Sequence, residues 1–189
     1  MYKIIVLMGE AGTGKDTVMQ AILKQNPSLH EIISCTSRPI RDNETPGVNY
    51  YYYTPGEFQK KIENGEMLEH TIFNDWYYGT GYDSLSKDKI NIGVFNPAGV
   101  RALRDREDCD ISVYYVRAAD KTRLLRQLNR EENPNVQEII RRFSTDSKDF
   151  ADLSDIPYTS FCNETITDLQ NIVDHILREV KTSGEQGQN

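Results

Sequence analysis

The sequence has few of the features that mark secreted, membrane-spanning or disulfide-stabilised proteins. Its three cysteines, Cys35, Cys109 and Cys162, are odd in number and far apart. We therefore expect reduced thiols of a cytoplasmic protein, with neither disulfides nor a close metal-binding pair. The apolar run at 4–8 is too short for a signal peptide, and no stretch approaches the roughly 20 apolar residues of a membrane span. These absences predict a protein without a membrane partner.

An excess of positive charge is also missing. The chain carries 29 Asp and Glu against 22 Lys and Arg, which gives a net charge of −7. This balance argues against binding to nucleic acid or to an anionic membrane, although an acidic protein can still contain a basic pocket. The 189 residues, 38% of them hydrophobic, suit a single domain over 1–189 with a full core. A monomer and a homodimer both stay open.

Apolar runs alternate with stretches of helical spacing, and this alternation predicts an α/β fold with a central parallel sheet. Strands are expected at 3–8, 89–95, 111–116 and 159–162. Helices are expected at 17–24, at about 99–106, at 122–143 with a break at 133–135, and at 165–180. The first strand is apolar throughout, as expected of a strand that is buried on both faces.

The stretch from 34 to 84 instead has the short strands and turns of an inserted subdomain. Strands are expected at 31–34, 48–53 and 67–73. Thr54-Pro55-Gly56-Glu57 predicts the start of a helix between the last two. Thr54 can cap that helix, Pro55 suits its first position, and Glu57 completes a capping box.

The run Gly9-Glu10-Ala11-Gly12-Thr13-Gly14-Lys15 follows the first strand directly and precedes a helix. Glycines at this spacing let backbone N–H groups turn toward phosphate oxygens, and the helix N-terminus adds positive potential. Lys15 is expected to reach the β- and γ-phosphates. The next position is usually a Mg²⁺-binding Ser or Thr, but here it is Asp16, followed by Thr17. We expect Asp16 or Thr17 to hold the metal.

The loop alone leaves GTPases, ATPases, motors and kinases open. No Asn-Lys-x-Asp motif for guanine recognition in GTPases is present, and no apolar strand ends in an Asp. The best candidate for such a strand ends in Asn96. A second phosphate site is indicated by Ser34 to Arg41, where two arginines, Arg38 and Arg41, stand beside hydroxyl groups. Arginine suits phosphate because its planar fork binds two oxygens at once.

Four further motifs, read together with the loop, resemble the guanylate kinase family. They are Ser34 to Arg41, Glu44-x-x-Gly47-x-x-Tyr50, the run Ile-Glu-Asn-Gly-Glu-Met-Leu-Glu at 62–69, and Tyr77-Tyr78-Gly79-Thr80. The family has Ser-x-Thr-Thr-Arg-x-x-Arg, Gly-x-x-Tyr, Glu-Asn-Gly-x-x-x-Glu and Tyr-Tyr-Gly-Thr in this order and spacing. The resemblance covers the insert almost completely and extends more weakly to both ends of the chain.

The resemblance implies a three-layer P-loop NTPase fold with a central parallel sheet, a small β-rich insert that binds the nucleoside monophosphate, and a helical lid. The core would comprise 1–33, 85–121 and 151–189, the insert 34–84 and the lid 122–150. The implied reaction is Mg²⁺-dependent transfer of the ATP γ-phosphoryl group to GMP or dGMP. The acceptor phosphate is already anionic, so positioning and charge neutralisation dominate and no general base is required.

The family's site residues carry over to matching positions of this chain. Arg38, Arg41, Tyr50 and Tyr78 match the positions that hold the GMP phosphate. Glu69 matches the acid that reads guanine N1 and N2, and Ser34 and Thr80 match hydroxyls near O6. Asn96, at the place of a family acid, is also expected to contact GMP. The resemblance implies ATP binding by Gly9, Glu10, Ala11, Gly12, Thr13, Gly14, Lys15, Asp16, Thr17, Arg126 and Asn163.

Arginines of the lid would close over ATP and stabilise charge on the transferring group. Arg126 and Arg130 are four residues apart, so we expect them to share a helix face. Arg142 is expected to join them, and Asn163 lies in a run that resembles the family's adenine-contacting loop. The implied catalytic residues are Lys15, Arg38, Arg130 and Arg142.

Two departures from the family bear on specificity. The family usually has Asp-x-Asp-x-Gln-Gly where this chain has Val94-Phe95-Asn96-Pro97-Ala98-Gly99, so both acids are lost. Asp16 brings a new carboxylate to the metal position, and our hypothesis is that it compensates. A monophosphate kinase of different or broader base preference and a non-catalytic binding module of guanylate kinase-like type are the alternatives.

Overall fold

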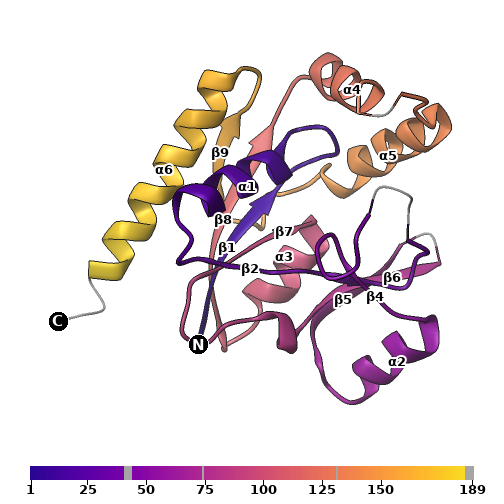
Figure 1. The fold of residues 1–189 in the computed structure, drawn as a ribbon, viewed down its shortest axis with the longest axis vertical. Coiled ribbons are helices and arrows are strands. Elements are labelled where there is room, and N and C mark those ends of the chain that lie inside the picture. Colours follow the sequence, from indigo (N-terminus) through magenta and orange to yellow (C-terminus); the bar gives the residue numbers. More distant parts are fainter. Residues whose placement is uncertain (41–43, 74, 131, 186–189) are drawn as a thin grey trace.

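The computed structural model describes residues 1–40, 44–73, 75–130 and 132–185. Its centre is a five-stranded sheet in the order β2-β7-β1-β8-β9, whose strands pair in parallel (Figure 1). The strands are β1 (Tyr2–Met8), β2 (His30–Glu31), β7 (Asn91–Phe95), β8 (Cys109–Arg117) and β9 (Thr159–Cys162). The predicted parallel α/β sheet is confirmed.

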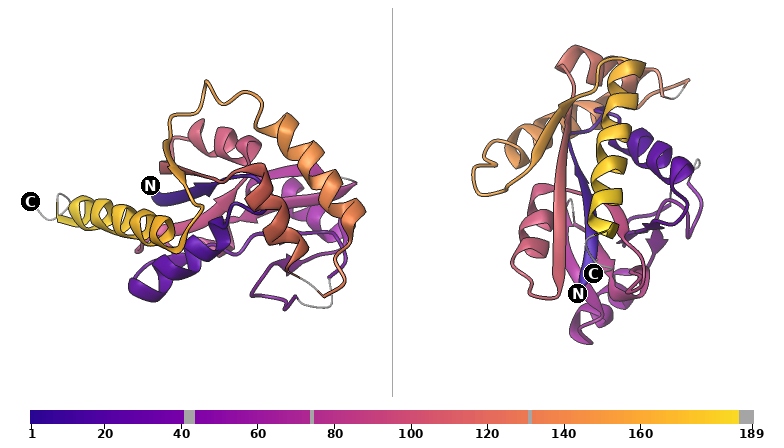
Figure 2. Two further views of the ribbon diagram at one scale, coloured as in Figure 1. Left: turned by 90° about the horizontal axis from the view of Figure 1, so that it is seen from above. Right: turned by 90° about the vertical axis from the view of Figure 1, so that its left-hand side faces the viewer.

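The apolar residues of β1 alternate between two cores, one on each face of the sheet. Ile5 and Leu7 pack with residues of α1 (Lys15–Gln25) and α6 (Ile166–Glu185). Ile4, Val6 and Met8 pack with residues of α3 (Pro97–Arg104) on the other face. Figure 2 shows the resulting helix–sheet–helix layers from two further sides. No helix in the described ranges is both long and apolar enough to cross a bilayer.

The insert forms a second sheet of four strands in the order β4-β3-β6-β5. Its strands are β3 (Cys35–Thr36), β4 (Tyr51–Tyr52), β5 (Met67–Phe73) and β6 (Trp76–Gly81), followed by a 3₁₀ turn, η1 (Tyr82–Ser84). Helix α2 (Pro55–Glu63) covers this sheet through Phe58, which is fully buried and stacks on Tyr77 at 5.1 Å between ring centroids. The predicted capping box is present, with Thr54 and Glu57 each accepting the other's backbone N–H.

Two helices, α4 (Asp120–Leu128) and α5 (Val136–Asp149), form the predicted lid region. The expected break between them is confirmed, and Asn135 caps α5 by accepting the N–H of Glu138 at 3.0 Å. Figure 1 shows both helices on the same side of the molecule as the small sheet, near the turn between β1 and α1.

Several predicted boundaries were wrong, and three of them have a clear physical reason. The strand expected at 31–34 is two strands, because the chain leaves the main sheet after Glu31 and joins the small sheet at Cys35. Within the range expected at 48–53, only Tyr51–Tyr52 forms a strand, and Tyr50 forms an isolated bridge with Pro46. Helix α3 starts at Pro97 and not at 99, because the Asn96 side chain accepts the N–H of Gly99 at 2.8 Å and caps the helix.

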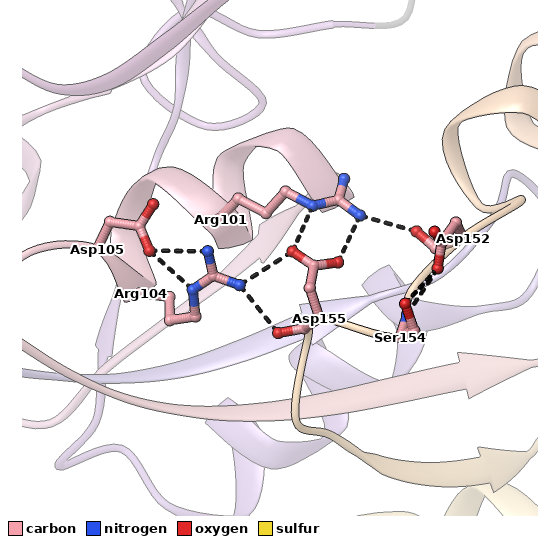
Figure 3. Close-up of polar contacts among 6 residues, drawn as sticks. All are labelled: Arg101, Arg104, Asp105, Asp152, Ser154 and Asp155. Atoms are coloured by element: carbon pink, nitrogen blue, oxygen red, sulfur yellow. Dashed lines mark hydrogen bonds and ion pairs between the residues drawn. The ribbon is translucent and has the colours of Figure 1, made fainter.

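An exposed ion-pair network fastens the segment between α5 and β9 to α3 (Figure 3). Arg101 binds both carboxylate oxygens of Asp155 at 2.9 Å and the backbone oxygen of Asp152 at 2.7 Å. Arg104 donates to the carboxylate and backbone oxygens of Asp155, both at 2.9 Å. These arginines hold the pKa of Asp155 well below its usual range. The chain is thereby anchored to the core directly after the lid.

Candidate active site

The glycine-rich loop joins β1 to α1 with the backbone that phosphate binding requires. Gly12 and Gly14 have φ of +84° and +87°, which L side chains rarely adopt. Thr13 between them is buried, and its hydroxyl donates to the backbone oxygen of Glu10 at 2.9 Å. Lys15 begins α1 directly after the loop. The glycine-rich loop therefore leads directly into the positive N-terminus of a helix, an arrangement that suits phosphate.

Two residues predicted to bind ATP lie directly against this loop. Asn163 is 2% exposed, and its amide donates to the backbone oxygen of Thr13 at 2.8 Å. Arg126 donates to the same oxygen at 3.2 Å and to that of Gly12 at 3.4 Å. Both side chains hold the shape of the loop, and their contact with ATP stays a prediction.

Asp16 and Thr17, the candidates for the metal, are exposed in the first turn of α1. Burial raises the pKa of Tyr50 in the small sheet, and the negative charge of Asp16 adds to that rise. Carboxylate and hydroxyl oxygens are ligands that Mg²⁺ accepts, together with water and phosphate.

The predicted acceptor-phosphate residues gather around a buried arginine. Arg38 is 8% exposed. Its two terminal nitrogens bind the two carboxylate oxygens of Glu44, and the bond from Nη1 measures 2.7 Å. The guanidinium of Arg38 lies 5.2 Å from the ring centroid of Tyr50. The ring of Tyr50 meets that of Tyr78 edge-on at 6.3 Å. Three of the four predicted residues are thus brought together, and the fourth, Arg41, lies outside the described residues.

The predicted base-reading residues face each other across the two long strands of the small sheet. Glu69 on β5 pairs in register with Thr80 on β6. Burial raises the pKa of Glu69 to about 7, and the nearby Thr80 hydroxyl lowers it slightly. That hydroxyl is fully buried and makes no regular hydrogen bond among the residues described. Buried polar groups are normally hydrogen-bonded, so the Glu69 carboxyl and the Thr80 hydroxyl could bind the polar groups of a ligand.

Asn96 lies near this pocket through α3. A Cβ placed on Gly99 would lie 3.3 Å from the Asn96 side-chain oxygen and 3.4 Å from a carboxylate oxygen of Glu69. The N-terminus of α3 therefore borders the base pocket, although the Asn96 oxygen caps the helix. Ser34 is partly buried just before β3, and its backbone oxygen accepts the N–H of Tyr51.

The lid arginines occupy different places. Arg141 and Arg142 both bind Glu138, at 2.6 Å and 3.0 Å, and lower its pKa to about 2. Glu138 raises the pKa of Arg141, and the charges of Tyr78 and Asp146 add to that rise. Arg130 is exposed and follows the end of α4 at Leu128, so the expectation that Arg126 and Arg130 share a helix face was wrong. Roles of Arg130 and Arg142 in catalysis stay predictions.

A family model described as guanylate kinase matches residues 1–179. The chain belongs to the guanylate kinase family. Curated guanylate kinases include one from Bacteroides thetaiotaomicron, 43% identical over 45% of this chain and 42% of that relative. Another, from Bacteroides fragilis, is 42% identical over 60% of this chain and 54% of that relative. The chain thus spans about half the length of the curated relatives it matches.

A solved structure confirms the fold. The guanylate kinase from Anaplasma phagocytophilum has a TM-score of 0.71 at 18% identity, with 96% of this chain and 86% of that chain covered. The likeness shows that this member of the guanylate kinase family has the predicted three-layer P-loop NTPase architecture. The resemblance drawn from the separated motifs is confirmed with it.

Sequence reasoning on this guanylate kinase family member missed several residues that the structure places at the site. Arg123 and Asp146 bind the phosphate loop, Glu44 pairs with Arg38, and Arg141 binds Glu138 beside Arg142. Arg123 and Asp146 lie 23 positions apart on two helices, so no local spacing reveals them. Glu44 is the first residue of the motif Glu44-x-x-Gly47-x-x-Tyr50. Its negative charge, close in sequence to Arg38 and Arg41, could have predicted an ion pair with one of them.

Proposed function

We propose that this protein transfers the γ-phosphoryl group of ATP to GMP or dGMP, giving ADP and the diphosphate. One observation carries the proposal: the chain folds both a glycine-rich phosphate loop and, on a second sheet, a buried arginine packed against two tyrosines. Burial raises the pKa of Tyr50 and the charge of Asp16 adds to that rise, while Glu138 raises the pKa of Arg141 and the charge of Tyr78 adds to it. Two anion sites on one molecule suit transfer between two nucleotides.

On the donor side, the loop N–H groups and Lys15 would bind the triphosphate. Asn163 and Arg126 support that role, because both donate to the backbone oxygen of Thr13 and so help to fix the shape of the loop. Such preorganised donors stabilise charge on the transferring group without rearrangement during the reaction. Arg130, Arg141 and Arg142 of the lid would add positive charge when the subdomains close.

On the acceptor side, Arg38, Tyr50 and Tyr78 would hold the monophosphate, with Arg41 beside them in sequence. Arg38 is already oriented by Glu44, so little side-chain freedom is lost when phosphate binds. Glu69 in its charged form would accept the two N–H donors of the guanine edge, and Thr80 and Ser34 would donate near O6. Asn96 borders this pocket at the end of β7.

Mg²⁺ fits the oxygen donors at the start of α1. We assign it to Asp16 or Thr17 together with the ATP phosphates, because Mg²⁺ keeps several waters and takes one or two protein ligands. When bound, the ion neutralises phosphate charge and helps to orient the transferring group. The free thiols of Cys35, Cys109 and Cys162 support a reducing, cytoplasmic location. We assign the core, insert and lid to 1–33, 85–121 and 151–189, to 34–84, and to 122–150.

A coupled assay of ADP release across GMP, dGMP, AMP, CMP, UMP and dTMP tests the proposal. We expect kcat/KM for GMP or dGMP to exceed that for every other monophosphate by about a hundredfold or more, because each unmatched buried polar group costs binding. Equal turnover of several bases would favour the broader monophosphate kinase. That outcome has a specific basis, because Glu69 with a pKa near 7 is protonated in about half of the molecules at neutral pH.

A further inference from the structure

Arg123 on α4 joins the lid to the phosphate loop. Its side chain is 7% exposed, and its guanidinium is directed at three neighbours. Nε donates to the backbone oxygen of Ala11 at 3.1 Å, and Nη1 donates to Asp120 at 2.8 Å. Nη2 donates to the carboxylate of Asp146 on α5 at 2.9 Å. Glu10 of the loop lies 3.8 Å from Nη1.

Asp146 closes a ring around one loop residue. The same carboxylate oxygen that binds Arg123 also accepts the backbone N–H of Ala11 at 2.7 Å. Both polar groups of Ala11 are therefore bound by one Arg–Asp pair, whose partners come from the two lid helices. Asp146 is 16% exposed, and burial raises its pKa while the Ala11 N–H, Arg123 and Lys15 oppose that rise.

The surroundings of the pair exclude water and bring the backbones close. The guanidinium of Arg123 lies 4.5 Å from the ring centroid of Phe143 on α5. A Cβ on Gly12 would stand 2.6 Å from the backbone oxygen of Arg123, so α4 lies directly against the loop. Removing Arg123 would leave the partly buried carboxylate of Asp146 without its paired cation, whereas removing Asp146 would leave Arg123 with Asp120 and Glu10 but without its link to α5.

We propose that Arg123 and Asp146 are positioning residues that latch both lid helices to the phosphate loop and fix the Ala11 peptide for ATP binding. The lid and the loop then behave as one unit, and closure over the acceptor falls to the insert at 34–84. The inference rests on the proposed binding of ATP at this loop.

Calorimetric titration with ATP alone tests the latch without requiring GMP turnover. The variants are Arg123→Gln, Asp146→Asn and the double variant. We expect each single substitution to weaken ATP binding by about tenfold, and the double to be no weaker than the worse single, because the two residues act as one unit. The double variant also removes both charges, which avoids the unpaired buried charge that destabilises a single variant.

Arg104→Gln and Asp155→Asn form a matched control, since they break an Arg–Asp pair that is 33% and 43% exposed and joins α3 to the segment before β9 (Figure 3). The controls should bind ATP within about twofold of the wild type. Latch variants that behave like these controls would overturn the proposal. Tighter ATP binding by Asp146→Asn would overturn it too, and would identify the carboxylate as a competitor of phosphate.

A second readout separates this inference from the proposed function. Hydrogen exchange at the Ala11 amide, followed by NMR without nucleotide, should be at least about tenfold faster in Arg123→Gln and in the double variant. If the wild type failed to bind ATP, the proposed function would fall, while faster exchange would still support the latch. Unchanged exchange at Ala11 in both variants would overturn it.

Discussion

Burial places the titration of Glu69 near neutral pH, with a pKa of about 7. Guanine recognition uses the charged form, because only a carboxylate accepts both N–H donors of the base edge. Affinity for GMP should therefore rise as the pH increases through 7. We expect the KM for GMP to fall by roughly tenfold between pH 6 and pH 8.

The Glu69→Gln variant provides the control for this pH dependence. The GMP phosphate itself titrates near pH 6, so the variant should keep only that part of the profile. The same shift predicts the sign of a stability effect. The folded state holds the Glu69 proton more tightly than the unfolded state, so this stabilisation is full below about pH 4.5 and is lost as the pH rises through 7. A KM profile identical in both proteins would contradict the assignment of Glu69.

Asp16 is the residue on which the metal hypothesis depends. Its carboxylate stands where a hydroxyl was expected, and both strand acids of the family are absent. We expect Asp16→Ala to raise the Mg²⁺ concentration needed for half-maximal activity by roughly tenfold. Asp88→Ala, an exposed acid in another loop, is the control and should leave the titration unchanged. Full activity with unaltered Mg²⁺ dependence in Asp16→Ala would remove the hypothesis.

Single residues were predictable where a motif fixes their surroundings. Gly12, Lys15, Arg38, Glu69 and Tyr78 all lie at the two halves of the site. Arg123 and Asp146 could not be found, because their role depends on how α4 and α5 pack against the loop. Arg141 was not singled out either, because its ion pair with Glu138 depends on the turn of α5 that brings positions three apart together.

At the scale of elements, the capping box at α2 offers a quantitative test. Thr54 accepts the N–H of Glu57 at 3.2 Å, and Glu57 accepts that of Thr54 at 2.8 Å. Thr54→Ala should lower the free energy of unfolding by about 1 kcal/mol in a urea titration. Thr182→Ala, which removes an exposed hydroxyl inside α6, should change it by less than about 0.5 kcal/mol. Equal effects in both variants would contradict a specific role of the cap.

Elements with a strong local signal were predictable, and those set by pairing partners were not. Strands β1 and β7 and the start of α2 could be predicted because the residues that determine them are adjacent in the sequence. The division of 30–36 between two sheets depends instead on β7 and β6, which lie more than 40 residues away. The early start of α3 follows from an asparagine cap that was read only as a replaced family acid.

At the scale of the whole molecule, the two arginine sets must surround one phosphoryl group, so closure should accompany binding of both nucleotides. Spin labels at Glu63 on α2 and Lys121 on α4, in a Cys162→Ser background that removes the exposed thiol, would report the distance between insert and lid. We expect this distance to shorten when ADP and GMP are added together, and to shorten less with either alone. A distance distribution unaffected by both nucleotides would contradict closure.

The central claim is that one phosphoryl group passes from ATP at the loop to GMP at the arginine–tyrosine cluster. The most direct measurement follows label from γ-³²P-ATP in the presence of GMP and Mg²⁺, with products separated by chromatography. The account predicts labelled GDP from the wild type, and a loss of roughly a hundredfold or more in rate for Lys15→Met and for Arg38→Ala. The claim would be contradicted if GMP still bound but neither GMP nor any other monophosphate, tested in its place, gave a labelled diphosphate. The protein would then be a binding module.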